Sequence, residues 1–426
     1  MANETYGAIK LSDANAVGSM LVKKMGGVGY APKDWADVIN LMGKLPEKTV
    51  SGAIANFADG ADDVPVKEAK FYFLPKQDSG TPTPSSPISI DGWTGLTAYR
   101  QKKNLFDKVN GNVVTGYIAT SSFNDGNTRA KTIYIEIKGG MTYTVSKTAG
   151  QRFQIATSEF APTNGATYTS RQTGNTSSSL TITASATDKY LWAWIYLAET
   201  DTGTLEDMLA SVQIEVGSTS TTYEAYSTPT TYPVSWSEHG TIYGGYVDAV
   251  TGEGKETIGM IRLDTLPFIK NSTQNNPNGT YFSLDGVTVP FLGWGSGGRD
   301  SASCNELAKA SAGAGGQTEP NNTFWWNNAS TGWRVVWGLP SGGSSLDDFM
   351  RFLTNRNVIV VGQLTTANDF SVSPVSPVPS TYLGSNNFYS DANGDTEVTY
   401  RADINLALSA SATRSAPVVQ EESEER

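Results

Sequence analysis

The sequence predicts a mainly β protein, in which an N-terminal region with short helices precedes two consecutive β-sandwich domains. Three observations predict this fold class. The chain has 426 residues, which is too long for one typical domain. Charged residues make up only 17% of it, against the usual quarter, while glycine occurs 43 times. Short apolar segments recur between loops rich in Gly, Ser, Thr and Asn, and this spacing is typical of strands in a sandwich.

Residues 1–65 are predicted to contain two short amphipathic helices. The first covers residues 34–42, where apolar side chains recur three and four positions apart: Trp35, Val38, Ile39 and Met42. The second is predicted to begin at a Thr49 cap and to present one apolar face, made of Val50, Ala53, Ile54 and Phe57. Helices this short bury little surface alone, so we expect residues 1–65 to form an anchoring region that packs on an outside surface.

The first β-sandwich is predicted over residues 103–226. A Pro/Ser-rich linker or surface strap over residues 66–102 precedes it, because three prolines within residues 82–87 disfavour helix. Both faces of residues 190–197 are apolar, which predicts a central strand covered on both sides. The strand candidates of this sandwich are residues 133–137, 142–145, 153–156, 180–184, 190–197 and 212–216. A linker over residues 227–241 is predicted after the sandwich.

The second β-sandwich is predicted over residues 242–403. Ser345 is the expected N-cap of a helix within it, with an apolar face made of Leu346, Phe349, Met350 and Leu353. Residues 404–426 are predicted to be a disordered acidic tail, because apolar content is low and charge is dense. The strand candidates are residues 242–247, 257–263, 280–284, 287–290, 332–339, 358–364 and 395–401.

The composition excludes several classes of chemistry. Cys304 is the single cysteine, so an intrachain disulfide and a cysteine-based zinc site are impossible. His239 is the single histidine, which excludes a histidine-rich metal site, and we expect neither a metal nor another cofactor. No base lies near Cys304 in the sequence, so an inert thiol is expected. The net charge of −11 disfavours binding to nucleic acid.

The sequence also indicates where the protein resides. No segment reaches the roughly 18–20 apolar residues that span a bilayer, so membrane insertion is not expected. The first residues lack a basic region followed by an apolar one, and no signal peptide is visible. The composition is nevertheless that of an extracellular β protein. A virus particle reconciles these features, because its proteins are made in the host cytoplasm and released by lysis.

Several phrases resemble virion proteins of tailed bacteriophages and prophages, of the head- or tail-fibre and minor structural type. The first phrases are YGAIKLSD at residues 6–13 and KNLFD at 103–107. The later phrases are VQIEVGST at 212–219, YEAY at 223–226, IYGGYVD at 242–248, YLGSNNFYSD at 382–391 and TEVTYR at 396–401. They bracket residues 103–226 and 242–401. The resemblance implies jelly-roll modules and supplies no catalytic residues.

The resemblance implies a non-enzymatic fibre or appendage of a phage particle, localised in the virion, that contributes to attachment to a host-surface glycan. Its expected partners are other virion proteins, contacted through the N-terminal region, and further copies of itself, with a homotrimer favoured by analogy with phage fibres. One alternative is a head fibre that decorates the capsid without a receptor role. Another is an enzyme that depolymerises cell-surface glycans, whose two carboxylates no motif identifies.

The candidate glycan-binding residues are Trp325, Trp326, Asn327 and Asn328. They lie in a polar context, and adjacent residues on a strand point to opposite faces, so at least one tryptophan is expected to be exposed. An indole ring stacks on the apolar face of a pyranose, and asparagine amides bond its hydroxyls. Burial of both tryptophans in the sandwich is the structural alternative, and the alternating Trp333, Val335 and Trp337 are expected in the core.

Overall fold

The structure is a computed structural model that describes most of residues 47–401. The gaps within this range are residues 60–62, 127–129, 148–151, 175–176, 197–203, 272–275, 285–286, 288, 292–301, 311–318 and 327–332. The described chain forms several β-sheets, which confirms the mainly β prediction. The predicted helix at residues 34–42 and the predicted tail at 404–426 lie outside the described residues.

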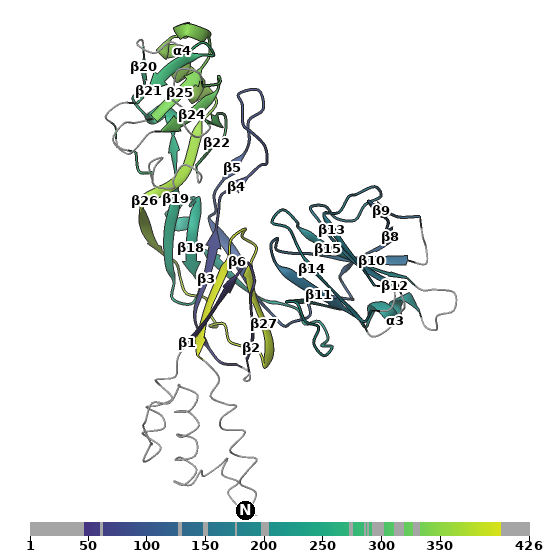
Figure 1. Ribbon diagram of the computed structural model, residues 1–426. Helices are drawn as coiled ribbons and strands as arrows, with labels where there is room; N and C mark the ends of the chain where they lie inside the picture. Colours follow the sequence, from purple (N-terminus) through teal and green to yellow (C-terminus); the bar gives the residue numbers. More distant parts are fainter. Residues whose placement is uncertain are drawn as a thin grey trace, which may run out of the picture.

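Two packed sheets form the centre of the molecule, called the frame below (Figure 1). The strand orders are β1-β28-β3-β18-β19-β26-β22 and β17-β6-β27-β2. Large side chains from both sheets, among them Phe71, Trp236 and Phe388, share one core. The strands are β1 (Glu47–Gly52), β2 (Ala55–Asp59), β3 (Val66–Phe73), β6 (Gly95–Gln101), β17 (Thr230–Ser235), β18 (Gly244–Asp248), β19 (Glu253–Arg262), β22 (Ser303–Cys304), β26 (Ile359–Ser371), β27 (Gly384–Ser390) and β28 (Thr396–Arg401).

The chain leaves the frame between β6 and β17 to build residues 103–226, called the first inserted unit. Its two sheets, β13-β12-β15-β10-β7 and β14-β11-β16, enclose a core of their own. The elements are β7 (Asn112–Thr115), β8 (Tyr117–Ile118), β9 (Phe123–Asn124), β10 (Ala130–Glu136), β11 (Thr142–Ser146), β12 (Arg152–Ser158), β13 (Ser170–Gly174), β14 (Ser179–Thr183), β15 (Tyr190–Tyr196), α3 (Leu205–Leu209) and β16 (Gln213–Val216).

Strand β15 is the central strand of the five-stranded sheet and is covered on both faces, as its sequence predicts. Leu191, Ala193 and Ile195 face the core between the two sheets. Trp192 and Trp194 face a second cluster on the outer side, which the β8–β9 hairpin covers.

The chain leaves the frame again between β19 and β26 to form residues 263–358, called the distal unit. Its sheet has the order β20-β21-β25-β24-β23 and packs against helix α4, where Phe349 stacks on Phe282 at 4.0 Å between ring centroids. The elements are β20 (Ile269–Lys270), β21 (Thr280–Ser283), β23 (Ala308–Lys309), β24 (Thr323–Trp326), β25 (Trp333–Trp337) and α4 (Leu346–Asn355). Among the described residues, 3₁₀ turns lie at Ser237–His239, Leu263–Thr265 and Pro340–Gly342.

The structure differs from the predicted second sandwich over residues 242–403. Strand β18 pairs with β3, β28 pairs with β3 and β1, and β27 pairs with β6 and β2. The two ends of this segment therefore belong to the frame, and residues 263–358 form a separate unit. Alternation shows which side chains of a strand are buried, but it does not identify the partner strand.

The N-terminal predictions also need correction. Residues 49–57 form parts of β1 and β2 and the turn between them rather than a helix. Phe57 faces the frame core and Val50 packs against it, whereas Ile54 in the turn packs into the core of the first inserted unit. Residues 66–102 are not a plain linker, since β3 and β6 lie inside the two sheets. Between them an arm made of β4 (Lys76–Gln77) and β5 (Ile90–Asp91) reaches the distal unit, where the Ile88 amide donates to the Asn305 carbonyl at 2.9 Å.

The described chain begins and ends at one place. Glu47 pairs with Arg401 in the β1–β28 register, so both flanking segments join the frame at the same end. In Figure 1 this end lies at the bottom, the first inserted unit to the right and the distal unit at the top.

Candidate ligand-binding cleft

The predicted glycan-binding residues fall at the edge of what the structure describes. Trp325 and Trp326 end strand β24, where their backbones pair with Arg334 and Trp333, and their side chains are outside the described part. Asn327 and Asn328 lie outside the described residues altogether. Their role in glycan binding therefore stays a prediction.

The neighbouring strand β25 behaves as predicted. Trp333 and Val335 are fully buried in the core of the distal unit. Trp337 is partly buried and stacks on Phe352 of helix α4 at 4.9 Å between ring centroids.

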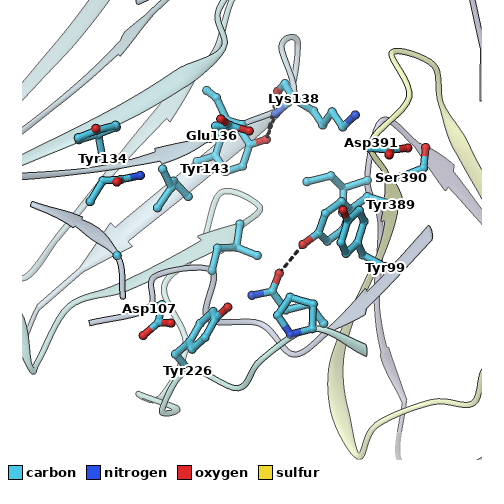
Figure 2. A pocket seen from close by; sticks show the side chains of 18 residues that line it. Tyr99, Asp107, Tyr134, Glu136, Lys138, Tyr143, Tyr226, Tyr389, Ser390 and Asp391 are labelled. Carbon is cyan, nitrogen blue, oxygen red and sulfur yellow. Dashed lines mark hydrogen bonds between the residues drawn. The ribbon is translucent and has the colours of Figure 1, made fainter. Parts of the chain in front are cut away.

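A cleft of about 480 Å³ lies between the first inserted unit and the frame (Figure 2). Strand β10 and the residues after it form one wall, and β6, β27 and the turn after β27 form the other. The segments that enter and leave the inserted unit close the cleft below. The labelled polar and aromatic residues are Tyr99, Asp107, Tyr134, Glu136, Lys138, Tyr143, Tyr226, Tyr389, Ser390 and Asp391.

Two of the tyrosines are fixed by hydrogen bonds. The Tyr389 hydroxyl donates to the Gln101 side-chain oxygen at 2.8 Å, and its ring stacks on Tyr99 at 5.0 Å between centroids. The Tyr143 hydroxyl donates to the Lys138 carbonyl at 3.1 Å and accepts from the Lys138 amide at 2.9 Å. Burial raises the pKa of both phenols, so they remain protonated at neutral pH.

The charged groups of the cleft are one ammonium and three carboxylates. Burial lowers the pKa of Lys138, and the negative charges of Asp391 and Glu136 oppose this shift. Lys138 donates to the carbonyl of Ala392, which ties the inserted unit to the frame.

The Asp107 carboxylate accepts hydrogen bonds within its own turn. It accepts from the Val109 amide at 2.9 Å and from the amide and side chain of Asn110. Burial alone would raise the pKa of Asp107, but these hydrogen bonds lower it overall. Asp107 is therefore ionised at neutral pH, which does not suit a general acid.

The phrases that resemble phage proteins meet beside this cleft. The Asn104 side-chain oxygen accepts from the amides of Phe106 and Ile214 at 3.1 and 3.2 Å, and its nitrogen donates to the Glu224 carbonyl at 2.9 Å. The Glu224 amide in turn donates to the Gln213 side-chain oxygen at 2.8 Å. These buried bonds join the two ends of the first inserted unit.

Tyr226, Tyr389 and Asp391 enter the sequence analysis only as members of the phrases at 223–226 and 382–391, and it missed that they line one cleft. The phrases at 223–226 and 382–391 lie far apart in the chain. No local sequence pattern indicates that the fold brings these residues together. The signal that could have identified them is the position of all three in phrases that open or close a unit.

The single cysteine and the single histidine both lie outside the cleft and contact other parts of the protein. Burial raises the pKa of the Cys304 thiol to about 12, so the thiol is protonated and enclosed, as expected for an inert cysteine. The His239 ring nitrogen contacts the Ser371 carbonyl at 2.8 Å. Within the described residues no group of three or more His, Cys, Asp or Glu could hold a metal. None of the helices described is long and apolar enough to cross a membrane.

Comparisons with known proteins identify no relative. Neither a scan against protein-family models nor a search of the curated proteins finds a match for this chain.

Proposed function

We propose that this chain is a non-enzymatic structural protein of a tailed-phage particle, a fibre or appendage that contributes to attachment to host-surface glycans. One observation carries the proposal. Both described ends of the chain join the frame at the β1–β28 edge, while the distal unit lies at the opposite end (Figure 1). In this proposal the flanking segments join the particle at that end, and the inserted units face the host.

The phage phrases support this assignment because they have a physical role in the frame. The Asn56 amide nitrogen donates to Asn387 at 2.7 Å, and Asn387 donates to the Lys102 carbonyl at 3.0 Å. With the Asn104 bonds, they fix where the first inserted unit leaves the frame. A frame that carries separately folded inserted units suits a host-facing protein in this proposal. Jelly-roll topology of these units and a homotrimer remain part of the proposal, by analogy with phage fibres.

The competing functions are a capsid-decorating head fibre and a glycan depolymerase. Labelling the protein on intact phage particles and locating it by electron microscopy tests the virion assignment and separates head from tail. We expect label at a projecting appendage, and particles without label would overturn the proposal. An assay of the purified protein for release of reducing ends from host glycans tests the enzyme alternative, and we expect no release.

The predicted glycan contact on the distal unit has its own test. Replacing Trp325 and Trp326 with Ala should reduce adsorption of the protein to host cells and leave its melting temperature unchanged. A large fall in melting temperature would instead assign both side chains to the core of the distal unit.

A further inference from the structure

We propose that the cleft between the first inserted unit and the frame binds a neutral saccharide, and that binding holds the two units together. This inference rests on the proposed role in glycan attachment, to which it adds a second site and a ligand class. The cleft volume of about 480 Å³ lies within the roughly 300–1,000 Å³ of small-ligand pockets.

The aromatic wall suits a sugar ring. Tyr99, Tyr134 and Tyr226 line the cleft and are half-buried. Within the described part of the chain, none of their hydroxyls has a hydrogen-bond partner. A flat ring covers the apolar face of a pyranose, and a phenol donates to and accepts from its hydroxyls.

Lys138 provides hydrogen-bond donors to the cleft. An ammonium has three N–H donors, and the described hydrogen bonds of Lys138 use one of them, to the Ala392 carbonyl. Figure 2 shows the ammonium extending across the cleft toward Ser390 and Asp391. The other donors are placed to meet the hydroxyls of a ligand that enters between the walls.

The charges of the cleft disfavour an anionic ligand. Asp107, Glu136 and Asp391 outnumber Lys138, so the walls repel an anionic sugar. Sugar hydroxyls donate well to the exposed carboxylates of Glu136 and Asp391, since hydrogen bonds to a charged acceptor are the stronger kind.

Binding would also change the junction between the units. Tyr134, Glu136 and Tyr226 belong to the first inserted unit, whereas Tyr99 and Asp391 belong to the frame. A ligand that contacts both walls binds only the folded arrangement, and it therefore raises the melting temperature as its concentration rises.

The test uses the purified full-length chain on an array of neutral, anionic and amine-bearing oligosaccharides, followed by calorimetry and melting with the best neutral probe. We expect binding to neutral hexose or N-acetylhexosamine oligosaccharides and a rise in melting temperature. Tyr226→Ala should weaken this binding at least tenfold, and Glu136→Gln, an exposed position that spares the fold, at least threefold.

Tyr223→Ala is the matched control, because Tyr223 lies in the same phrase but is 40% exposed and bonds to the Ala210 carbonyl outside the cleft. Equal loss in Tyr223→Ala and Tyr226→Ala, tighter binding of anionic probes, or no neutral probe bound would overturn the inference. Loss of neutral binding in the Trp325→Ala, Trp326→Ala protein instead of the cleft variants would do the same.

The two proposals fail separately. Saccharide binding at the cleft by a protein that is absent from particles would overturn the virion assignment and leave the cleft inference standing. If the protein is found on the particle but its cleft binds no neutral saccharide, the cleft inference is overturned and the virion assignment stands.

Discussion

Asn104 shows how one buried side chain can decide where an inserted unit begins. It is 1% exposed, and its side chain bonds three backbone groups: the amides of Phe106 and Ile214 and the carbonyl of Glu224. Residues of similar shape without both an acceptor and a donor cannot replace it. The KNLFD phrase therefore has a physical explanation that does not involve a ligand.

We predict that Asn104→Ala destabilises the protein by about 2–4 kcal/mol, because a buried amide or carbonyl left without its partner costs about 1–3 kcal/mol. Urea unfolding of the purified protein measures the change. Asn368→Ala is the control, since Asn368 is exposed and bonds only to Glu256 at 2.9 Å, and surface changes usually stay within about 0.5 kcal/mol. Equal effects of the two substitutions would show that the Asn104 bonds do not matter.

A second buried polar residue, Asp188, is expected to make the stability of the protein depend on pH. Asp188 is 2% exposed, and burial alone would raise its pKa, but hydrogen bonds from the Thr169 hydroxyl at 2.6 Å and the Ser185 amide at 2.8 Å lower it overall. A folded-state pKa below the ordinary 3.8 contributes stability above that value, and the contribution is lost as pH falls from 3.8 through the folded pKa.

We therefore expect Asp188→Asn to lower the melting temperature at neutral pH, and the difference from the unchanged protein to shrink below pH 3.8. Thermal melting across acidic and neutral pH measures it. A difference that stays constant with pH would mean that the carboxylate charge makes no contribution.

At the scale of the element, helix α4 is the clearest success of local reasoning. Ser345 is its N-cap, as predicted: the hydroxyl accepts from the Asp348 amide at 3.1 Å and donates to the Asp348 carboxylate at 2.7 Å. Phe349 and Leu353 from the predicted apolar face are fully buried. The cap and the apolar face both depend on residues that are close together in the sequence, so the sequence alone could predict them.

Strands β1 and β2 show where local reasoning stops. The spacing of Val50, Ile54 and Phe57 fits a helix, but Val50 and Phe57 lie on strands that pair with β28 and β27, at the other end of the chain. Ile54 packs into the core of the first inserted unit, which is also built from distant residues. Likewise, β15 could be predicted as a central strand from its own two faces. The cleft could not be predicted, because its walls meet only after two insertions have left one frame.

We predict that Ser345→Ala costs about 1 kcal/mol of stability, the usual loss for removing a serine N-cap. The hydrogen bond from Ser345 lowers the pKa of Asp348, so we expect the effect to diminish in acid as that carboxylate is protonated. Asn355→Ala, at the exposed C-terminal end of the same helix, is the control. Urea unfolding at neutral and acidic pH compares the two, and equal losses would refute a capping role.

At the scale of the whole molecule, the frame is built mainly from three separate parts of the chain. Residues 47–101, 230–262 and 359–401 interleave in its two sheets, and the short strand β22 adds an edge to one of them. Each inserted unit has its own core, whereas the frame core exists only when all three parts are present. The frame is therefore the part most sensitive to truncation.

The last prediction concerns where the N-terminal region can be cut. Strand β2 is held to the frame by Phe57, which is 7% exposed and whose ring stacks on Tyr400 at 4.2 Å and on Phe388 at 5.8 Å between centroids. A chain of residues 47–426 keeps β1 and β2, so we expect it to stay soluble and to melt cooperatively near the temperature of the full chain. A chain of residues 66–426 loses both strands and exposes an apolar core, so it should aggregate or melt far lower. Circular dichroism melting and size-exclusion chromatography distinguish the two, with Phe57→Ala in the longer chain expected to cost about 3–5 kcal/mol. A stable, monodisperse 66–426 protein would show that β1 and β2 belong to a separate anchoring region after all.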